Sequence, residues 1–362
     1  MEKPVVVFAL LDWGLGHTTR TLPIIRHLME LNYAPIVACN PDQKALLWEE
    51  LPAIEFIHLD GYNLKYSRLG DYTRLMIIFQ IPKILIKIRQ ENRWLRQLVK
   101  KRKIDLVISD NRFGFNSSKV PSVFITHQLG IKTGMGPIID QLIRFFNYRY
   151  INRFSTCWVP DFSTDPNLAG ELSHPLHVPE KPVTYLGCLS RLESCIHQTA
   201  KKEFVLIILS GPEPQRTLLE RKIIEDAVQV IQAMVLVRGL PGNSNQLNAP
   251  SHVKVFNHLP AAILNDYLCT ASYVIGRSGY TSIMDYMKTG VRSILIPTPG
   301  QAEQEYLALY LHQQQLAFTI EQNKFLLNAA LRQAGNFNYK KINWKMDGYK
   351  IAINEFINSI TR

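Results

Sequence analysis

The sequence lacks several features that would assign it to a large protein class. It has five cysteines and no C-x-x-C pair, which argues against a disulfide framework or a zinc site. No stretch reaches the roughly 20 apolar residues that a membrane-spanning helix needs, and the apolar run at the start is shorter than the core of a signal peptide. We therefore expect a cytoplasmic protein with reduced, mostly buried thiols at Cys39, Cys157, Cys188, Cys195 and Cys269.

The composition is that of a globular chain with an excess of positive charge. Hydrophobic residues make up 46% and charged residues 20% of the chain, so it is not a disordered protein. One hydrophobic core stops growing near roughly 250–300 residues, and the 362 residues of this chain therefore indicate two domains. The net charge of +11 predicts an anionic partner, which can be a phosphate compound, a nucleic acid or an acidic membrane surface.

The positive charge is concentrated in residues 65–103, which contain twelve Lys and Arg against two acidic residues. Apolar residues such as Trp94 alternate with the basic ones, as in helices that bind anionic lipid surfaces. We expect this stretch to make peripheral contact with an anionic membrane, with residues 142–154 extending the patch. The alternative is a solvated helix face. Because the stretch has no recognisable RNA-binding motif, we expect no nucleic-acid partner.

Short apolar runs alternate with amphipathic stretches along the chain. Buried strands separated by helices are typical of a parallel sheet that is covered on both faces. Predicted strands cover 5–10, 34–39, 53–59, 105–110, 121–127 and 155–161, and then 204–210, 232–239, 253–259, 272–276 and 292–297. Predicted helices cover 19–31, 41–51, 72–102 and 136–154, and then 214–230, 260–270, 280–289 and 302–314.

The pattern restarts after a proline-rich polar stretch, residues 162–203. The fold class is therefore α/β, with two Rossmann-like, doubly wound parallel-sheet domains. We place the first domain at residues 1–185 and the second at residues 186–345. The tail, residues 346–362, is expected to form a helix that packs back on the first domain.

Ligands of such sheets bind at the carboxyl ends of the strands. The loop "DWGLGH" follows the first strand and brings Gly14, Gly16 and His17 to the start of a helix. A cation is disfavoured there, so a neutral imidazole acting as a base is plausible chemistry, although the loop is not a complete G-x-G-x-x-G and an ordinary turn is the alternative. Further candidates at strand ends, each with a structural alternative, are Asp110, His127 and Gln128.

In the second domain, the stretch "GRSGYTSIMD" joins a strand to a helix. Backbone N–H groups after Ser278 can meet a diphosphate, and Asp285, two turns along, can accept both hydroxyls of a ribose. An ordinary tight turn is the alternative. The loop "SGPEPQRT" offers polar side chains, but its two prolines remove amide donors. Candidates for binding a ligand with a diphosphate and a ribose are Ser210, Gly211, Glu213, Gln215, Arg216, Arg277, Ser278, Gly279, Tyr280, Thr281, Asp285, Gln301, Glu303 and Gln304.

Together these features resemble the GT-B glycosyltransferases, and the MurG-like group of glycosyltransferase family 28 in particular. "SGYTSIMD", "VRSILIP" and "EQEYLAL" stand where that group has S-G-x-x-T-x-x-E, a P-x-x-x-x-P strand and a Q-Q-x-x-N-A helix. Asp285 replaces the glutamate, Gln304 and Glu305 replace the glutamine pair, and "SGPEPQ" replaces a Gly-Gly-Ser loop. "GLGH" and "THQ" resemble motifs of the group's first domain, so the resemblance covers nearly the whole chain.

The resemblance implies two domains facing across a cleft and an inverting, metal-independent transfer of a sugar to an acceptor hydroxyl. It places Arg191 near the diphosphate and implicates Phe256, Asn257 and His258 in holding the uracil. We expect a UDP-linked donor such as UDP-N-acetylglucosamine, no cofactor and no metal. The acceptor is expected to be a saccharide or a lipid-linked cell-envelope compound at the inner face of the cytoplasmic membrane. His17 is the expected base, with Asp110 as its rival.

Two other functions remain open on the sequence. A UDP-sugar 2-epimerase has the same architecture, but it needs several acid/base carboxylates and no second substrate. A non-enzymatic protein that binds nucleic acid through its basic surface is the other alternative.

Overall fold

The computed structural model describes residues 2–62, 70–195, 203–240 and 245–360, and only the backbone of 70–79. The chain forms two compact units. Unit 1 is built by Met1–Lys65, Arg74–Leu189 and Lys345–Arg362, and unit 2 contains Ser190–Trp344. The sequence analysis placed the corresponding divisions after residues 185 and 345. The prediction of two doubly wound parallel-sheet domains is confirmed.

Unit 1 has a seven-stranded sheet in the order β3-β2-β1-β4-β5-β6-β7, and its strand pairs are parallel. Its central strand is completely buried from Val6 to Leu10, as expected for a strand with helices on both sides. The strands are β1 (Val5–Leu10), β2 (Ala34–Cys39), β3 (Glu55–His58), β4 (Leu106–Asp110), β5 (Ser122–Ile125), β6 (Thr156–Val159) and β7 (Val183–Tyr185).

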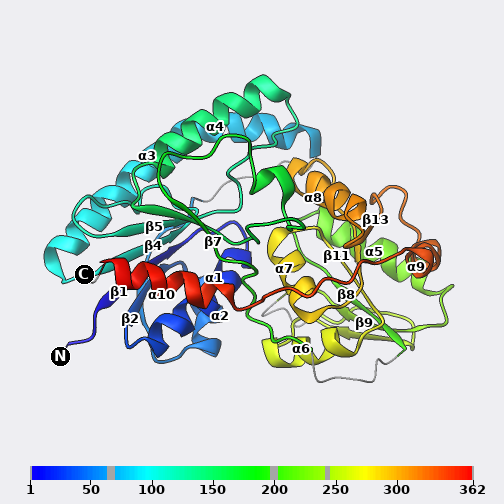
Figure 1. Ribbon diagram of the computed structural model, residues 1–362. Coiled ribbons are helices and arrows are strands. Elements are labelled where there is room, and N and C mark those ends of the chain that lie inside the picture. The colour runs from blue at the N-terminus through cyan, green and yellow to red at the C-terminus, as the bar shows by residue number, and fades with distance from the viewer. Residues whose placement is uncertain (1, 63–69, 196–202, 241–244, 361–362) are drawn as a thin grey trace. The chain divides into compact units, whose positions relative to one another are not determined.

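Helices α3 and α4 lie on one face of this sheet, and α1, α2 and α10 lie on the other (Figure 1). The last helix returns to the first part of the chain, where His27 Nε2 is hydrogen-bonded to Asn354 Oδ1 at 2.9 Å. The Trp158 ring meets Phe356 edge to face at 5.4 Å. These helices are α1 (Gly16–Glu30), α2 (Pro41–Glu50), α3 (Gly70–Lys101), α4 (Pro137–Ile151) and α10 (Gly348–Ile360).

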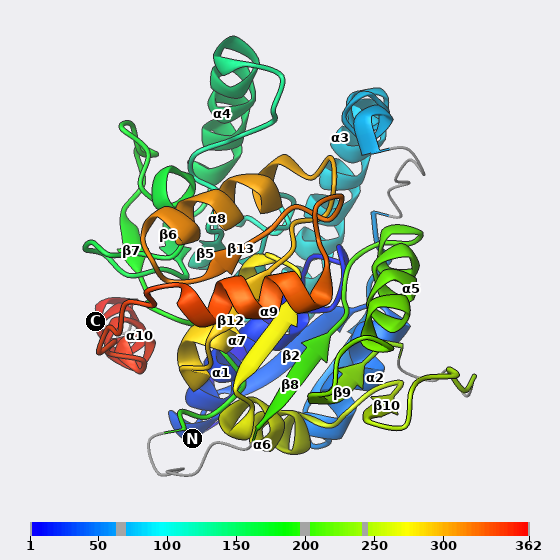
Figure 2. The ribbon, with the colours of Figure 1, turned by 90° about the vertical axis from the view of Figure 1, so that its right-hand side faces the viewer.

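Unit 2 has a six-stranded parallel sheet in the order β10-β9-β8-β11-β12-β13. Helices α5 and α9 cover one face, as Figure 2 shows, and α6 and α7 lie on the other. The strands are β8 (Phe204–Ile208), β9 (Ala233–Val237), β10 (Val253–Phe256), β11 (Tyr273–Gly276), β12 (Ser293–Leu295) and β13 (Phe318–Thr319). The helices are α5 (Gln215–Ala227), α6 (Ala261–Thr270), α7 (Tyr280–Thr289), α8 (Ala302–Gln313) and α9 (Leu327–Asn336).

Among the strands and α-helices, three were not predicted, namely β7, β13 and α9, and neither was the short 3-10 helix Gly170–Leu172. The two strands have only three and two residues, too few for a period-two pattern to show. Helix α9 buries Leu327, Ala330 and Ala334 in the main core of unit 2. Alanine gives a weak hydrophobic signal, so the helical period of this segment was not evident.

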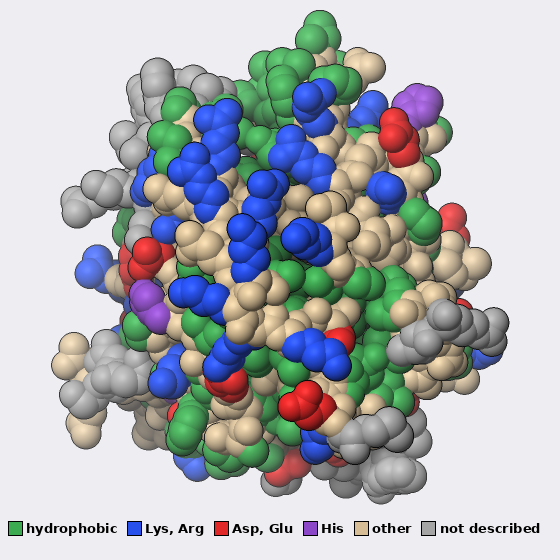
Figure 3. Space-filling model, turned by 90° about the vertical axis from the view of Figure 1, so that its left-hand side faces the viewer, with side chains coloured by type: hydrophobic (Ala, Val, Ile, Leu, Met, Phe, Trp, Pro, Cys, Tyr) green, Lys and Arg blue, Asp and Glu red, His purple; other side chains and the backbone are tan. Residues whose placement is uncertain are grey.

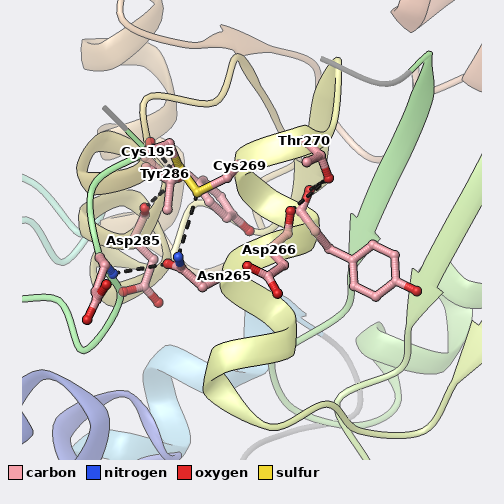
Figure 4. The surroundings of a disulfide bond; sticks show 10 residues. Cys195, Asn265, Asp266, Cys269, Thr270, Asp285 and Tyr286 are labelled. Atoms are coloured by element: carbon pink, nitrogen blue, oxygen red, sulfur yellow. Dashed lines mark hydrogen bonds between the residues drawn. A yellow bond between two sulfur atoms is a disulfide. The ribbon is translucent and has the colours of Figure 1, made fainter. Parts of the chain in front are cut away.

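The prediction of five reduced thiols is wrong at two positions. Cys195 and Cys269 form a disulfide whose Cα atoms lie 5.4 Å apart, whereas Cys39, Cys157 and Cys188 are reduced and buried, as expected. The bonded cysteines are separated by 74 positions in the sequence, so no local spacing motif joins them. The disulfide links the first residues of unit 2 to the last turn of α6 (Figure 4).

Candidate active site

The carboxyl ends of the central strands of unit 1 bring four polar side chains together. Asp110 ends β4, next to Leu10 at the end of β1, and His17 stands in the first turn of the following helix. His17 Nδ1 lies 2.9 Å from Asp110 Oδ1. Arg20 donates to both oxygens of Asp110, with its Nε 2.7 Å from Oδ2. Its Nη1 also lies 3.3 Å from Nδ1 of His127.

The charges of this cluster favour a neutral His17 beside an ionised Asp110. Burial alone would raise the pKa of Asp110, but Arg20 and His17 outweigh it and hold that pKa well below its usual range. Burial lowers the pKa of His17, Arg20 lowers it further, and Asp110 opposes both in part. Because Asp110 accepts the proton of Nδ1, the lone pair of the neutral ring is on Nε2. The His17 side chain is 13% exposed, so the ring is not sealed in the core.

This arrangement changes the relation between two predicted residues. The sequence analysis treated Asp110 as a rival base to His17. Both oxygens of Asp110 are instead bound by Arg20, and one of them also by His17. A carboxylate that is buried and paired in this way is a weak base. Asp110 therefore has the geometry of an orienting partner for the His17 ring.

The remaining candidates of unit 1 lie in nearby loops. Gly14 has φ +78, a left-handed conformation that favours glycine, and Gly16 is the first residue of α1. Gln128 follows His127, and its backbone N–H donates to Thr126 Oγ1 at 3.0 Å. Their roles at an acceptor stay predictions.

In unit 2, the junction between β11 and α7 presents a helix N-terminus. Gly279 is the N-cap residue, and no side chain caps the helix there. The Ser278 hydroxyl donates to the carbonyl of Gln304 at 2.8 Å, and Tyr280 and Thr281 are the first helical residues. A helix N-terminus of this kind favours an anion, because its N–H groups and its dipole point outward.

Directly before this junction, Arg277 is buried, and no carboxylate of the described residues pairs with it. Its guanidinium donates to three backbone carbonyls, those of Gln215, Ile296 and Pro297, at 2.8–3.2 Å. Its Nε has no hydrogen-bond partner in the part of the chain that the structure describes, and burial lowers the pKa of Arg277 to about 10. Five arginines are buried in the described part of the chain. Four of them are paired with a carboxylate, namely Arg20, Arg112, Arg216 and Arg238.

The loops beside Arg277 contain a second unpaired polar atom. Thr298 is buried, and its hydroxyl has no hydrogen-bond partner among the residues described. Gly211 has φ +99, and a Cβ there would lie 3.6 Å from that hydroxyl oxygen. Gln304 holds this loop, since its Oε1 accepts from the Thr298 N–H at 2.9 Å and its Nε2 donates to Gln301 at 2.5 Å. The two glutamines therefore bind each other and the loop.

Asp285 lies on α7 and is partly exposed. Its Oδ1 accepts a hydrogen bond from the Ser190 hydroxyl at 2.5 Å. Burial raises the pKa of Asp285 to about 6, although Ser190 and Arg191 act in the opposite direction. This carboxylate is therefore much less acidic than an ordinary surface aspartate.

Two predicted donor-binding residues, Glu213 and Arg216, are bonded to each other, and Arg216 also bonds to other side chains of unit 2. Arg216 donates to Glu213 at 2.6 Å, to Glu220 at 2.9 Å and to Thr217 at 2.7 Å. Glu220 also accepts from Arg238 at 2.8 Å. All three guanidinium nitrogens of Arg216 are thus used within unit 2, and its contact with a phosphate stays a prediction.

The residues predicted at the uracil follow or end β10 and are partly exposed. Asn257 Oδ1 accepts from Arg238 at 2.9 Å, which leaves the amide partly engaged. The Phe256 ring has the Lys254 ammonium 4.9 Å from its centroid. The uracil contacts of Phe256, Asn257 and His258 stay predictions. Gln215 is the first residue of α5, and its side-chain oxygen accepts from Gln322 at 3.0 Å. Donor contacts of Arg191, Ser210, Gln215 and Glu303 stay predictions.

The sequence analysis missed four side chains that organise these sites: Arg20, Ser190, Arg238 and Thr298. Arg20 stands three residues after His17, on the same helix face, which is a usable signal. Ser190 precedes the candidate Arg191 directly, but its partner is 95 positions away. Contacts of that range depend on the tertiary fold and leave no local pattern.

Comparisons with known proteins agree with this architecture. Residues 217–360 match the model of the glycosyltransferase family 28 C-terminal domain. No curated protein sequence matches the chain. The chain is similar to a solved structure of the kitacinnamycin glycotransferase, with 17% identity, a TM-score of 0.66 and coverage of 99% of this chain and 100% of that one.

Two further structures are similar over nearly their whole lengths. A UDP-glucosyltransferase from Polygonum tinctorium is 13% identical, with a TM-score of 0.64 and full coverage of both chains. The spinosyn rhamnosyltransferase SpnG, complexed with thymidine diphosphate, is 11% identical, with a TM-score of 0.63 and coverage of 99% of this chain and 96% of that one. At these identities the likeness shows the fold, which is the GT-B fold of glycosyltransferases.

The family match adds the class of enzyme. The chain is a glycosyltransferase whose second half carries a family 28 C-terminal domain. Membership of the MurG-like group stays a prediction.

Replacing His17 is expected to flatten the pH dependence of stability below neutral pH. The pKa of His17 is lower in the folded protein than its unfolded value of about 6.5. As the pH falls below that value, the unfolded chain binds this proton first and stability falls. His17→Gln removes this part of the slope, at most about 1.4 kcal/mol per pH unit. Urea unfolding between about pH 7.5 and 5 measures it, with the exposed His177→Gln as control. Equal slopes for wild type and His17→Gln would contradict the assignment.

Proposed function

We propose that the protein transfers a sugar from a nucleotide-linked donor, bound by unit 2, to an acceptor hydroxyl that is activated in unit 1. The observation that carries this proposal is the unbalanced charge at the carboxyl edge of the second sheet. Arg277 is buried without a carboxylate in the described chain, beside an unpaired Thr298 hydroxyl and an uncapped helix N-terminus. A diphosphate supplies the negative charge and the acceptor atoms that these groups lack.

Asp285 extends the same site toward a ribose. It stands five residues after the first residue of α7, which is about 7–8 Å along the helix axis. A carboxylate at this distance from the phosphate position can accept both ribose hydroxyls. One helix therefore presents an anion site at its start and a hydroxyl-binding carboxylate further along, in the order in which a nucleoside diphosphate needs them.

In the proposed reaction, the acceptor hydroxyl gives its proton to Nε2 of His17. The acceptor oxygen forms a bond to the anomeric carbon while the bond from that carbon to the diphosphate oxygen breaks, with inversion. Asp110 keeps the proton of the His17 ring on Nδ1 and stabilises the imidazolium that forms. The α7 N-terminus and Arg277 stabilise the charge on the departing diphosphate. These steps need no metal ion, and metal independence is part of the proposal.

We propose a uridine diphosphate donor, such as UDP-N-acetylglucosamine. One structural neighbour is a UDP-glucosyltransferase, and another is complexed with thymidine diphosphate. Both names support a pyrimidine nucleoside diphosphate. Thymidine diphosphate is the second candidate. Its base differs from uracil by one methyl group, and its deoxyribose offers Asp285 the 3′-hydroxyl alone, so the ribose contact favours the uridine compound.

The acceptor is proposed to be lipid-linked because unit 1 has an exposed surface of basic and apolar character. Helix α4 exposes Ile138 (81%), Leu142 (55%) and Phe145 (61%), which lie three to four residues apart on one face. Four exposed basic residues of α3 recur at a similar spacing, namely Arg89, Arg93, Arg96 and Lys100, and the exposed Lys83 stands six residues before the first of them. Lys65 and Arg68 of the predicted patch lie outside the described residues, and the side chain of Arg74 is not described.

The two helices lie together in unit 1. Ile84 and Ile88 of α3 and Tyr150 of α4 pack on one small hydrophobic cluster. Figure 3 shows a face with many Lys and Arg side chains and few acidic ones, with hydrophobic side chains among them. None of the described helices is long and apolar enough to cross a membrane. Peripheral contact with an anionic lipid surface fits this combination of charge and apolar side chains.

The ribose contact predicts how nucleotide analogues bind. UDP should bind the wild type, and 2′-deoxy-UDP and 3′-deoxy-UDP should each bind about tenfold more weakly, because a hydrogen bond to a charged group is lost. Asp285→Asn should weaken UDP and abolish this discrimination. Affinity should also fall as the pH drops through about 6, where Asp285 gains a proton. Isothermal titration calorimetry measures all three, and Asp266→Asn, on the neighbouring α6, is the control. Equal binding of UDP and both deoxy analogues would contradict the contact.

The proposed proton transfer predicts that both His17 and Asp110 are needed for turnover. His17→Ala should lower kcat by about 100-fold or more, since general base catalysis is lost. Asp110→Asn should also lower kcat, because an amide does not hold the ring in the same tautomer or stabilise its cation. Steady-state kinetics with a radiolabelled sugar donor measure both, with His177→Ala as control. Near-normal turnover in His17→Ala, together with no activity in Asp110→Asn, would reverse the assignment.

The membrane contact predicts salt-sensitive binding to vesicles that contain phosphatidylglycerol. Arg89→Glu combined with Arg93→Glu should weaken binding at least tenfold, since each basic residue near an anionic surface contributes about 1 kcal/mol. Phe145→Ser combined with Phe146→Ser should weaken it as well. The control, Arg221→Glu with Lys324→Glu, makes the same charge change on unit 2. Flotation with vesicles measures binding, and no flotation of the wild type would remove the lipid surface from the proposal.

A further inference from the structure

The first residues of unit 2 place a hydroxyl group on the carboxylate of Asp285. Ser190 Oγ donates to Asp285 Oδ1 at 2.5 Å, and it accepts from the backbone N–H of Leu192 at 3.1 Å. The second bond fixes the direction of the hydroxyl proton, because the N–H occupies one of the oxygen lone pairs. Asp285 Oδ2 has no hydrogen bond within the described residues. The carboxylate is thus held at one oxygen and open at the other.

The segment that carries Ser190 is itself fastened to α6 at two points. The backbone N–H of Glu193 donates to Asn265 Oδ1 at 3.0 Å. Cys195 is bonded to Cys269, and Asn265 Nδ2 lies 3.7 Å from the Cys269 sulfur. Figure 4 shows Asn265 and Asp285 close together on the neighbouring helices, with the disulfide beside them. The segment 190–195 is therefore bonded to Asp285 at Ser190, to Asn265 at Glu193 and to Cys269 at Cys195.

We propose that Ser190 is a positioning residue for the donor, and that the Cys195–Cys269 disulfide keeps it in place. This inference rests on the proposed function, because it takes Asp285 as the ligand of the ribose. A carboxylate that is fixed before the donor arrives loses less side-chain freedom on binding. With the disulfide open, the described residues 190–195 keep the hydrogen bond from Glu193 to Asn265 and the buried Leu192 side chain but lose their covalent link to α6, so the Ser190 bond is held less firmly.

The redox step is an ordinary thiol–disulfide exchange. A dithiol gives two electrons and two protons, becomes a disulfide itself, and leaves thiols on Cys195 and Cys269. Cys195 is partly exposed and Cys269 is buried, so we expect the exchange to begin at Cys195. The three other cysteines are buried thiols outside the disulfide, so they are thiols in both states. Donor affinity would then depend on the thiol–disulfide balance around the protein.

The first test separates a positioning role from a general structural one. Ser190→Ala should raise the Kd for UDP, measured by calorimetry, about tenfold, and it should raise the donor KM by a similar factor with kcat unchanged within about twofold. Ser190→Thr keeps the hydroxyl and should restore Kd to within about twofold of wild type. Ser194→Ala removes a hydroxyl from the same segment and is the control. If Ser190→Ala and wild type had the same Kd, or if Ser190→Thr were as weak as Ser190→Ala, the positioning role would be overturned.

The second test examines the disulfide. Wild type treated with dithiothreitol, with complete opening of the bond verified by alkylation and mass measurement, should bind UDP about three- to tenfold more weakly than oxidised wild type. The double variant Cys195→Ser/Cys269→Ser should match the reduced wild type and should not respond to dithiothreitol. Equal Kd values for oxidised and reduced wild type would overturn the proposed role of the disulfide in holding Ser190. A change in the Kd of the double variant on adding dithiothreitol would overturn it as well. Oxidised wild type that binds neither UDP nor thymidine diphosphate overturns the proposed function and this inference with it.

Discussion

The buried guanidinium of Arg277 is the feature on which the account of unit 2 depends. A buried charge is costly unless an opposite charge or a set of hydrogen bonds compensates it. The other four buried arginines of the described chain are paired with carboxylates. Arg277 has backbone carbonyls and an unpaired Nε. The fold thus retains, at the start of α7, a buried positive charge that an anionic ligand can compensate.

Unit 1 uses buried charge in a different way. There Arg20 and Asp110 compensate each other, and the pair holds the ring of His17 in one orientation. A second buried pair, Arg112 and Glu91, lies 2.9 Å apart, and Arg112 also donates to the Leu10 carbonyl. The charges at this sheet edge are internally balanced, which suits a site that moves a proton and recognises a hydroxyl. In the proposed reaction the two units would contribute complementary chemistry, anion binding by unit 2 and proton transfer by unit 1.

Much of this could be predicted from sequence because the pattern is local. Buried strands such as β1 and β2 are continuous apolar runs, and their predicted bounds agree with the structure. The junction at Gly279 and the position of Asp285 on α7 followed from a strand, a glycine and a helix in succession. The fold class and the GT-B resemblance rested on these signals, and both are confirmed.

Other features were beyond sequence reasoning because they join distant residues. The Cys195–Cys269 bond and the Ser190–Asp285 bond each span a large part of unit 2 and follow no motif. The pairing of Arg20 with Asp110 depends on α1 following β1 and on β1 lying beside β4 in the sheet. The missing carboxylate of Arg277 is visible only once every neighbour is placed.

A crystal structure of the protein with UDP bound tests the central claim most directly. The account predicts that the diphosphate lies at the first turn of α7, next to Arg277, and that the ribose hydroxyls lie within hydrogen-bond distance of the Asp285 carboxylate. A nucleotide bound elsewhere on unit 2, or one whose ribose does not meet Asp285, would contradict it.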